Sequence, residues 1–473
     1  MIRTLAVTAA FAALCVSSAV AQPAPPPNFP GQADFRDLYK ELIETNTTVS
    51  AGSCTVAAQA MAGRLKAAGY ADKDLQILIP PNRPKDGNLI AVLHGADPAA
   101  KAIMLLAHID VVEAKREDWE RDPFKLVEEN GYFYARGASD DKAMAASFTD
   151  AMIRYKKEGF KPRRDIKLAL TCGEETPDTF NGAHWLMTTH RSEMDAAFAL
   201  NEGAGGRLQG DNRVYLGIQA GEKVYQDYTL EVTNPGGHSS RPIRDNAIYH
   251  LAGGLSKIGL YDFPAHLNEA TRLHFERMGP ILGGQTGADM KAALAQPTPA
   301  DAVASIARDP GYNSMMRTTC VATMVNAGHA LNALPQRATA NVNCRILPGE
   351  APEAVMATLA KVMDDPAIHI RMAGEKSPVS PPPPLGKDIT GPAETVAHQL
   401  WPTVPLVPAM STGATDGRFL VAAGVPTYGL SGMFGESDGG GVHGLNERIR
   451  VRSLYEGREY LYRVVKVYAN SAG

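Results

Sequence analysis

The stretch that decides the fold opens with IMLLAHID (residues 103–110) and closes with RGASDDK (residues 136–142). Its first part is an apolar run typical of a buried strand, and this run leads to His108 and Asp110. Residues two apart share one face of a strand, so His108 could bind a metal ion while Asp110 orients its ring. A single histidine after an apolar run is more commonly a core or capping residue. This stretch alone leaves both interpretations open.

The second part of the stretch places Asp140 at the start of a helix. Met144, Phe148, Met152 and Tyr155 recur at intervals of three to four residues, which predicts an amphipathic helix. A carboxylate at a helix N-terminus is stabilised as an anion by the helix dipole. Asp140 is therefore a candidate for a metal ligand, which must stay deprotonated at neutral pH.

Two further apolar runs also end in acidic residues. These are Glu174 and Glu175 after the run 166–171, and Glu202 after the run 196–200. Since ligands gather at the carboxyl ends of strands in α/β sheets, we expect these carboxylates to lie beside the two candidates above. Any one glutamate could be a solvated surface charge, but adjacent carboxylates directly behind a buried strand favour a nearby cation.

Length, composition and charge restrict the class of protein. A chain of 473 residues favours two domains, and 44% hydrophobic with 21% charged residues is ordinary for a soluble globular protein. The formal charge of -4 argues against a nucleic-acid partner, for which a basic surface is expected.

Residues 1–21 are predicted to be a secretory signal peptide. Arg3 is the only charge, residues 5–16 form an apolar core, and Ala19–Ala21 supplies a small-residue cleavage pattern. The apolar stretch is too short for a stable membrane span, and no other segment is apolar enough. We therefore expect an exported protein, secreted or periplasmic, that does not bind a membrane.

Four cysteines remain after cleavage of the signal. Export permits disulfides. Cys320 and Cys344 lie in two strand-like runs joined by a turn, so they could pair across neighbouring strands, although sequence does not fix connectivity. Cys172, beside the acidic pair, is interpreted as a small buried residue rather than a nucleophile; the fourth is Cys54.

The predicted architecture is α/β with an inserted smaller domain. Residues 22–221 and 378–473 form the two parts of a catalytic domain, and residues 222–377 form an α+β domain between them. Residues 260–317 are polar and poorly periodic, and we interpret them as an insertion in the smaller domain. Residues 89–93 are expected to pair with the strand 103–107 through a turn near Gly95.

A dinuclear metal site needs a bridging carboxylate and two or three further ligands for each ion. Imidazoles and carboxylates without thiolates suit catalytic zinc with open positions. Glu174 is then spare, placed to take a proton from water and pass it to a leaving amine. The candidate ligands are His108, Asp140, Glu175, Glu202 and His443.

Nine segments together resemble the dinuclear-zinc metallopeptidase family of aminoacylase, glutamate carboxypeptidase, carnosinase and succinyl-diaminopimelate desuccinylase. Each segment alone is a weak signal, but their joint occurrence in this order is highly specific, and the resemblance covers nearly the whole mature chain. The segments are AHIDVV, DWERDPF, ARGASDDK, CGEET, NEG, NPGGHSS, NALPQRATANVNCRI, STGATDGRF and GVHGLNE.

The resemblance implies a three-layer zinc-peptidase catalytic domain holding two zinc ions per chain, with cobalt or manganese as substitutes. Asp140 would bridge the ions, with His108 and Glu202 on one and Glu175 and His443 on the other. Glu174 would be the general base and Asp110 would orient His108. The Asp140–Asp141 peptide bond would be cis.

The resemblance also makes the smaller domain a lid and dimerisation module of a homodimer. His238 would reach an active site, commonly the partner's, and help hold the oxyanion. Arg345 would pair with a free substrate carboxylate. Asn332 would contact substrate, and Gly413 would line the pocket.

The predicted function is that of an exported zinc-dependent hydrolase. Its substrates would be small peptides or N-acyl amino acids with a free carboxylate, as for a carboxypeptidase, dipeptidase or aminoacylase. The alternative is a non-catalytic exported protein that binds zinc or a ligand on the same fold. A dinuclear phosphoesterase is a weaker third reading, because the multiple Asp and His ligands expected for phosphate chemistry are missing.

Overall fold

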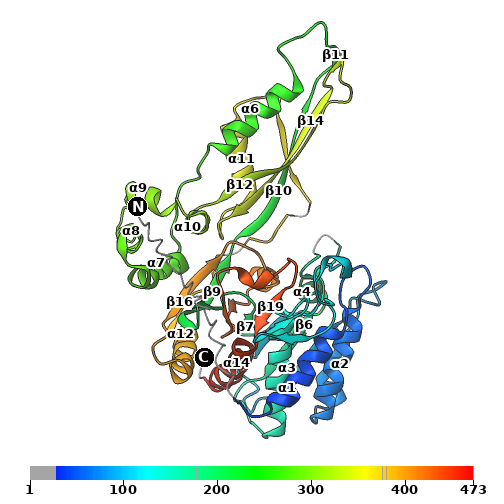
Figure 1. Cartoon of the computed structure of the whole chain (residues 1–473), viewed down its shortest axis with the longest axis vertical. Coiled ribbons are helices and arrows are strands. Elements are labelled where there is room, and N and C mark those ends of the chain that lie inside the picture. Colours follow the sequence, from blue (N-terminus) through cyan, green and yellow to red (C-terminus); the bar gives the residue numbers. More distant parts are fainter. Residues whose placement is uncertain (1–27, 177–178, 375, 380, 472–473) are drawn as a thin grey trace, which may run out of the picture.

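A ten-stranded mixed sheet lies at the centre of the larger of two bodies (Figure 1). The computed structural model describes residues 28–471 except 177, 178, 375 and 380, so the predicted signal peptide lies outside the described residues. The sheet order is β1-β2-β6-β3-β7-β17-β9-β8-β18, with β16 also paired to β9. Its strands are β1 (Leu75–Leu78), β2 (Asn88–Leu93), β3 (Ile103–His108), β6 (Ile166–Thr171), β7 (Phe198–Asn201), β8 (Gly206–Gln209), β9 (Asn212–Glu222), β16 (Leu406–Ser411), β17 (Thr427–Gly429) and β18 (Phe434–Gly435).

Helices cover both faces of this sheet. The side chains of β3 are apolar on both faces, so each face packs against its own apolar core. Ile103 and Leu105 face one core, and Met104 and Leu106 face the other. The first core is covered by α1 (Gln32–Glu44), α2 (Cys54–Ala67), α3 (Lys142–Lys157), α12 (Lys387–Leu400) and α14 (Val451–Asn470). The second is covered by α4 (Gly182–Thr189), α5 (Arg191–Met194) and α13 (Gly417–Ala422). A small sheet of β4 (Val127–Glu129), β5 (Tyr132–Tyr134) and β19 (Arg448–Arg450) completes this three-layer body.

The predicted pairing of residues 89–93 with 103–107 is wrong. β2 pairs with β1 and β6, and β6 lies between β2 and β3. The turn after β2 bonds to the chain that enters β6: Ala96 N–H donates to Pro162 O, and Asp97 N–H donates to Arg163 O. The crossover through α3 therefore delivers β6 into the position that a hairpin partner would occupy.

The second body is an arm that extends away from the first (Figure 1). It contains an antiparallel sheet in the order β12-β14-β10-β15, with α6 and α11 packed against it. Cys320 and Cys344 lie opposite each other on β12 and β14 and form a disulfide. The elements are β10 (Val224–Thr233), β11 (Gly237–His238), α6 (Ala247–Gly259), β12 (Thr319–Ala327), β13 (Ala333–Leu334), β14 (Arg337–Ile346), α11 (Pro352–Met363) and β15 (His369–Ala373).

The poorly periodic segment 260–317 forms four helices. Although it leaves and rejoins the arm, α7 packs on β16 of the larger body, where His274 Nδ1 lies 2.8 Å from Pro408 O. Arg277 donates to Leu406 O on the same strand. The helices are α7 (Glu269–Leu282), α8 (Gly284–Ala293), α9 (Ala300–Ile306) and α10 (Pro310–Met316). Across the described residues, no helix combines the length and apolar character needed to cross a membrane.

Candidate metal centre

The carboxyl ends of β6, β3 and β7 meet at one edge of the sheet, as the sequence predicts. β3 pairs in parallel with both of its neighbours. His108 is the last residue of β3, Glu174 and Glu175 follow β6, and Glu202 follows β7. The order of the strands thus places four candidate residues side by side, although they span almost a hundred positions of sequence.

Asp140 lies between two imidazoles, one at each carboxylate oxygen. His108 Nε2 lies 3.1 Å from Asp140 Oδ1, and His443 Nε2 lies 3.1 Å from Asp140 Oδ2. Glu202 Oε1 is 3.9 Å from His108 Nε2, and Glu175 Oε1 is 2.9 Å from His443 Nε2. All five predicted ligands therefore form two groups that share Asp140, and the ligand atoms within each group lie within 4.8 Å of one another.

The charges of this cluster are strongly perturbed. Burial raises the pKa of Glu202 well above its usual range, while the two imidazoles outweigh burial and hold the pKa of Asp140 well below its own. Hydrogen bonds to Asp140 and Glu175 raise the pKa of His443 to about 10. Without a cation, protonated imidazoles supply the positive charge that stabilises the crowded carboxylates. Two divalent cations would supply that charge instead, and carboxylates with neutral imidazoles are suitable ligands for them.

Asp110 connects the histidine to the acidic loop. Its Oδ1 accepts a hydrogen bond from Glu174 N–H at 3.2 Å, and its Oδ2 accepts one from Glu175 N–H at 3.0 Å. His108 Nδ1 lies 3.1 Å from the Asp110 carbonyl oxygen and 3.6 Å from Oδ1. Asp110 therefore contacts the ring of His108, mainly through its backbone carbonyl, and holds the loop after β6 through its carboxylate.

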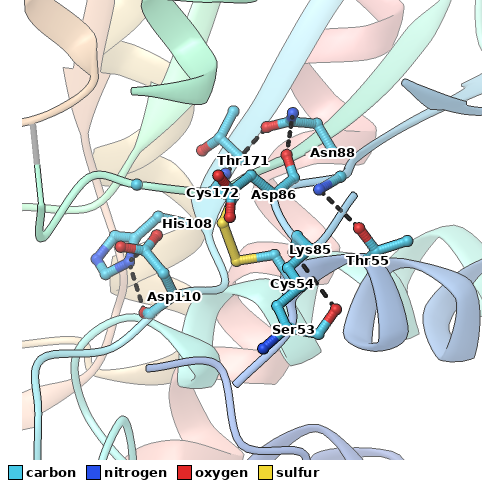
Figure 2. Close-up of a disulfide and its surroundings, with 12 residues drawn as sticks. Ser53, Cys54, Thr55, Lys85, Asp86, Asn88, His108, Asp110, Thr171 and Cys172 are labelled. Carbon is cyan, nitrogen blue, oxygen red and sulfur yellow. Dashed lines mark hydrogen bonds and ion pairs between the residues drawn. A yellow bond between two sulfur atoms is a disulfide. The ribbon is translucent and has the colours of Figure 1, made fainter. Parts of the chain in front are cut away.

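The acidic loop is also held by a disulfide that the sequence analysis missed. Cys172 is buried, as expected, and its sulfur is no free nucleophile because it pairs with Cys54 at the start of α2 (Figure 2). Asn88 Oδ1 accepts a hydrogen bond from Cys172 N–H at 3.0 Å. Because the two cysteines are 118 positions apart, the cross-link stabilises the fold by about 5 kcal/mol in a chain-entropy model.

Glu447 is a second residue that sequence reasoning missed. This buried carboxylate accepts hydrogen bonds from the backbone N–H groups of Gly137, Ser139 and Asp140, at 3.0, 2.8 and 3.1 Å. It also pairs with buried Arg136 at 2.7 Å. Glu447 thereby fixes the backbone that carries the shared ligand. The only signal was its place in the segment GVHGLNE.

The cis peptide bond expected between Asp140 and Asp141 is confirmed.

Asp416, another buried carboxylate, accepts hydrogen bonds from Thr171 Oγ1 at 2.7 Å and Asn181 Nδ2 at 2.6 Å. These contacts join the loop after β16 to the end of β6, and so to the edge of the sheet that carries the candidate metal ligands.

The remaining predicted site residues lie on other elements. His238 and Asn332 lie together at the tip of the arm, away from the candidate metal ligands (Figure 1). Arg345, on β14, is half-buried with its guanidinium 4.6 Å from the centre of the Tyr225 ring. Gly413 begins the loop whose Thr415 lines a small cavity together with Glu202.

Comparison with known proteins places the chain in a family. The model of peptidase family M20/M25/M40 matches residues 104–467. The mouse N-fatty-acyl-amino acid synthase/hydrolase PM20D1 is 26% identical over 79% of this chain and 75% of its own. Probable carboxypeptidase S-like 2 of Dictyostelium discoideum is 27% identical over 79% and 72%.

The fold matches that of solved members. The M20 family metallo-carboxypeptidase Sso-CP2 from Sulfolobus solfataricus superposes with a TM-score of 0.69 at 20% identity, covering 92% of this chain and 99% of its own. Enzymes of this family are metal-dependent hydrolases, which agrees with the two ligand groups around Asp140. The chain belongs to peptidase family M20/M25/M40 and is a metallopeptidase or amidohydrolase of that family.

Proposed function

We propose that the protein is an exported dinuclear-zinc hydrolase that cleaves the amide bond of small peptides or N-acyl amino acids with a free carboxylate. The observation that carries this proposal is the pair of ligand groups that share Asp140. Two relatives with acyl-amino acid and carboxypeptidase names support this range of substrates.

In this proposal His108 and Glu202 would hold one zinc ion, Glu175 and His443 would hold the other, and Asp140 would be shared by both. Zinc supplies Lewis acidity to the amide carbonyl and to the attacking water. Glu174 takes the proton of that water and transfers it to the leaving amine. Burial raises the pKa of Glu174 to about 9, which makes its carboxylate a stronger base than that of an ordinary glutamate, and the charge of two bound cations would favour the ionised form that accepts the proton.

Arg345 is the proposed partner of the substrate carboxylate. Among the residues that the structure describes, its guanidinium pairs with no carboxylate, and the positive charge of Arg418 lies nearby. Arg418 lines the same small cavity as Glu202. The carboxylate of the substrate thus lies on the side of the metal centre that faces the arm.

The arm is proposed to act as a lid and as the interface of a homodimer. Its edge strand β12 exposes Val321, Met324 and Val325, which are 59, 72 and 63% accessible. An exposed apolar edge strand is an unusual liability unless it is covered. Closure of the arm would bring His238 to an active site. Sedimentation of a monomer at working concentration would contradict the dimer.

Export is supported by the predicted signal peptide together with the two disulfides, which persist in oxidising compartments. We expect the protein recovered from the periplasm or medium to begin at Gln22 and to carry both disulfides. Intact-mass spectrometry with and without reduction measures both features. A protein that retains residues 1–21, or four free thiols, would contradict export.

The test of the proposed function is hydrolysis by the mature protein. A panel of dipeptides and N-acyl amino acids is assayed with and without a chelator, and again after zinc is restored. We expect turnover to be lost on chelation and to return with zinc. Turnover by a metal-free preparation would contradict the proposal. Two bound zinc ions without any hydrolysis would instead favour a non-catalytic zinc- or ligand-binding protein.

A further inference from the structure

A second, larger cavity opens from the metal centre. It has a volume of about 400 Å³, within the range of sites that bind small molecules. Its wall includes the metal ligands Asp140 and Glu202, and the apolar side chains of Met144, Met433 and Phe434. A substrate whose amide bond lies at the metal centre can therefore extend one part into this cavity.

Three arginines line this cavity, and they differ in their partners. Arg448 pairs with Asp438 at 2.6 Å, and Arg450 pairs with Asp211 at 2.6 Å. Arg207 is half-buried, yet within the described part of the chain no carboxylate forms an ion pair with it. A half-buried guanidinium without a counter-ion can form a charge-assisted pair with an anion that enters the cavity.

Tyr215 lies directly opposite Arg207 in the pairing of β8 with β9, and both residues line the cavity. The charge of Arg207 also acts on the phenol of Tyr312. Burial raises the pKa of Tyr215 and of Tyr312, while the positive charge of Arg207 acts in the opposite direction. Both hydroxyls therefore stay protonated at neutral pH, and neither makes a hydrogen bond to another described residue. A guanidinium beside free hydroxyl donors is an arrangement that binds a carboxylate.

Glu202 lines both cavities, so a substrate bound at the metal centre can extend one end into each cavity. The small cavity on the arm side contains Arg418, and the large cavity contains Arg207. If the amino-acid carboxylate is held on the arm side, the acyl group enters the large cavity. Arg207 is five positions after Glu202, so their Cα atoms lie at most about 18 Å apart, within reach of a medium-length acyl chain.

We propose that Arg207, with Tyr215, selects an acyl group that ends in a second carboxylate. The substrates are then N-acyl amino acids whose acyl group is a dicarboxylic acid bound through one end. This inference rests on the proposed hydrolase function and assigns the acyl side of the same site. Arg207 acts in binding and takes no part in proton transfer.

The experiment compares matched substrates of the zinc-loaded mature protein. Each amino acid carries an acyl chain ending either in a carboxylate or in the equivalent carboxamide, over a series from succinyl to sebacoyl. At the best length, kcat/KM for the carboxylate should exceed that for the carboxamide by about tenfold or more. Arg207→Met should lower the former by about 10- to 100-fold and the latter much less, because the neutral carboxamide makes a weaker hydrogen bond to the guanidinium than the carboxylate does.

Two further variants control for charge and shape. Arg207→Lys should retain part of the preference, because the positive charge remains. Arg371→Met, at an exposed arginine on β15, changes the net charge equally and should leave both substrates unaffected. Equal loss for carboxylate and carboxamide in Arg207→Met, or no preference in the wild type, would overturn the inference.

Calorimetry with suberate separates this inference from the proposed function. If no amide is hydrolysed by the zinc-loaded protein, the proposed function fails, yet suberate binding still reports on Arg207. Binding weakened about tenfold in Arg207→Met supports the anion site. Unchanged binding in that variant overturns it.

Discussion

Glu174→Gln is expected to lower kcat by about 10²- to 10⁴-fold while the protein keeps its bound metal. The amide has nearly the shape of the carboxylate but cannot accept the proton of the attacking water. Glu174 is outside both ligand groups that share Asp140, so the metal ligands remain complete. Steady-state kinetics and metal analysis on the same preparation measure the two effects.

The matched control is Glu113→Gln. Glu113 accepts hydrogen bonds from Ser50 on the exposed rim, so its amide should leave kcat almost unchanged. If Glu174→Gln keeps wild-type kcat, another group is the base. If it loses metal in proportion to activity, Glu174 is a ligand instead.

Glu447→Ala is expected to destabilise the metal-loaded protein by about 3–5 kcal/mol. The substitution leaves the buried Arg136 guanidinium without its counter-ion and three backbone N–H groups without their acceptor. Denaturant unfolding of the metal-loaded protein measures this loss. Because the freed backbone carries Asp140, metal affinity should fall as well.

A paired variant separates the two roles of Glu447. Replacing Arg136 and Glu447 together with leucine removes both buried charges, so stability should recover in part. Metal affinity should stay low, since the backbone around Asp140 still lacks its acceptor. Glu41→Ala, which breaks a surface ion pair with Arg64, serves as the control and should change neither quantity. Full recovery of metal affinity in the double variant would contradict a positioning role for Glu447.

The edge that carries the candidate metal ligands could be predicted because the strands that form it have a clear pattern in the sequence. β3, β6 and β7 are short apolar runs buried on both faces, the pattern of central parallel strands, and each is followed by a ligand type. Asp140 was recognisable from the helix that follows it. The carboxyl ends of parallel strands meet at one edge of a sheet, so these residues could be expected to lie together even though no long-range contact was known.

Other features depend on contacts that leave no local pattern. Cys54 and Cys172 are separated by 118 positions, and nothing in the sequence selects that pair. Glu447 acts through backbone N–H groups, which have no side-chain signature. The inserted helices were hidden because α7 contains Pro280 and α8 is rich in glycine and alanine, so neither shows a clear apolar period.

The inserted helices change the mechanics of the molecule. An arm joined to a body by two adjoining segments can rotate about a single hinge axis. Here the chain also passes from the arm to α7 and returns from α10 to β12, so four segments join the two bodies. Side chains of α7 form hydrogen bonds to the backbone of β16, and the end of β16 leads to the loop of Asp416. Any rotation of the arm would therefore also act on the strand that leads to the candidate metal site.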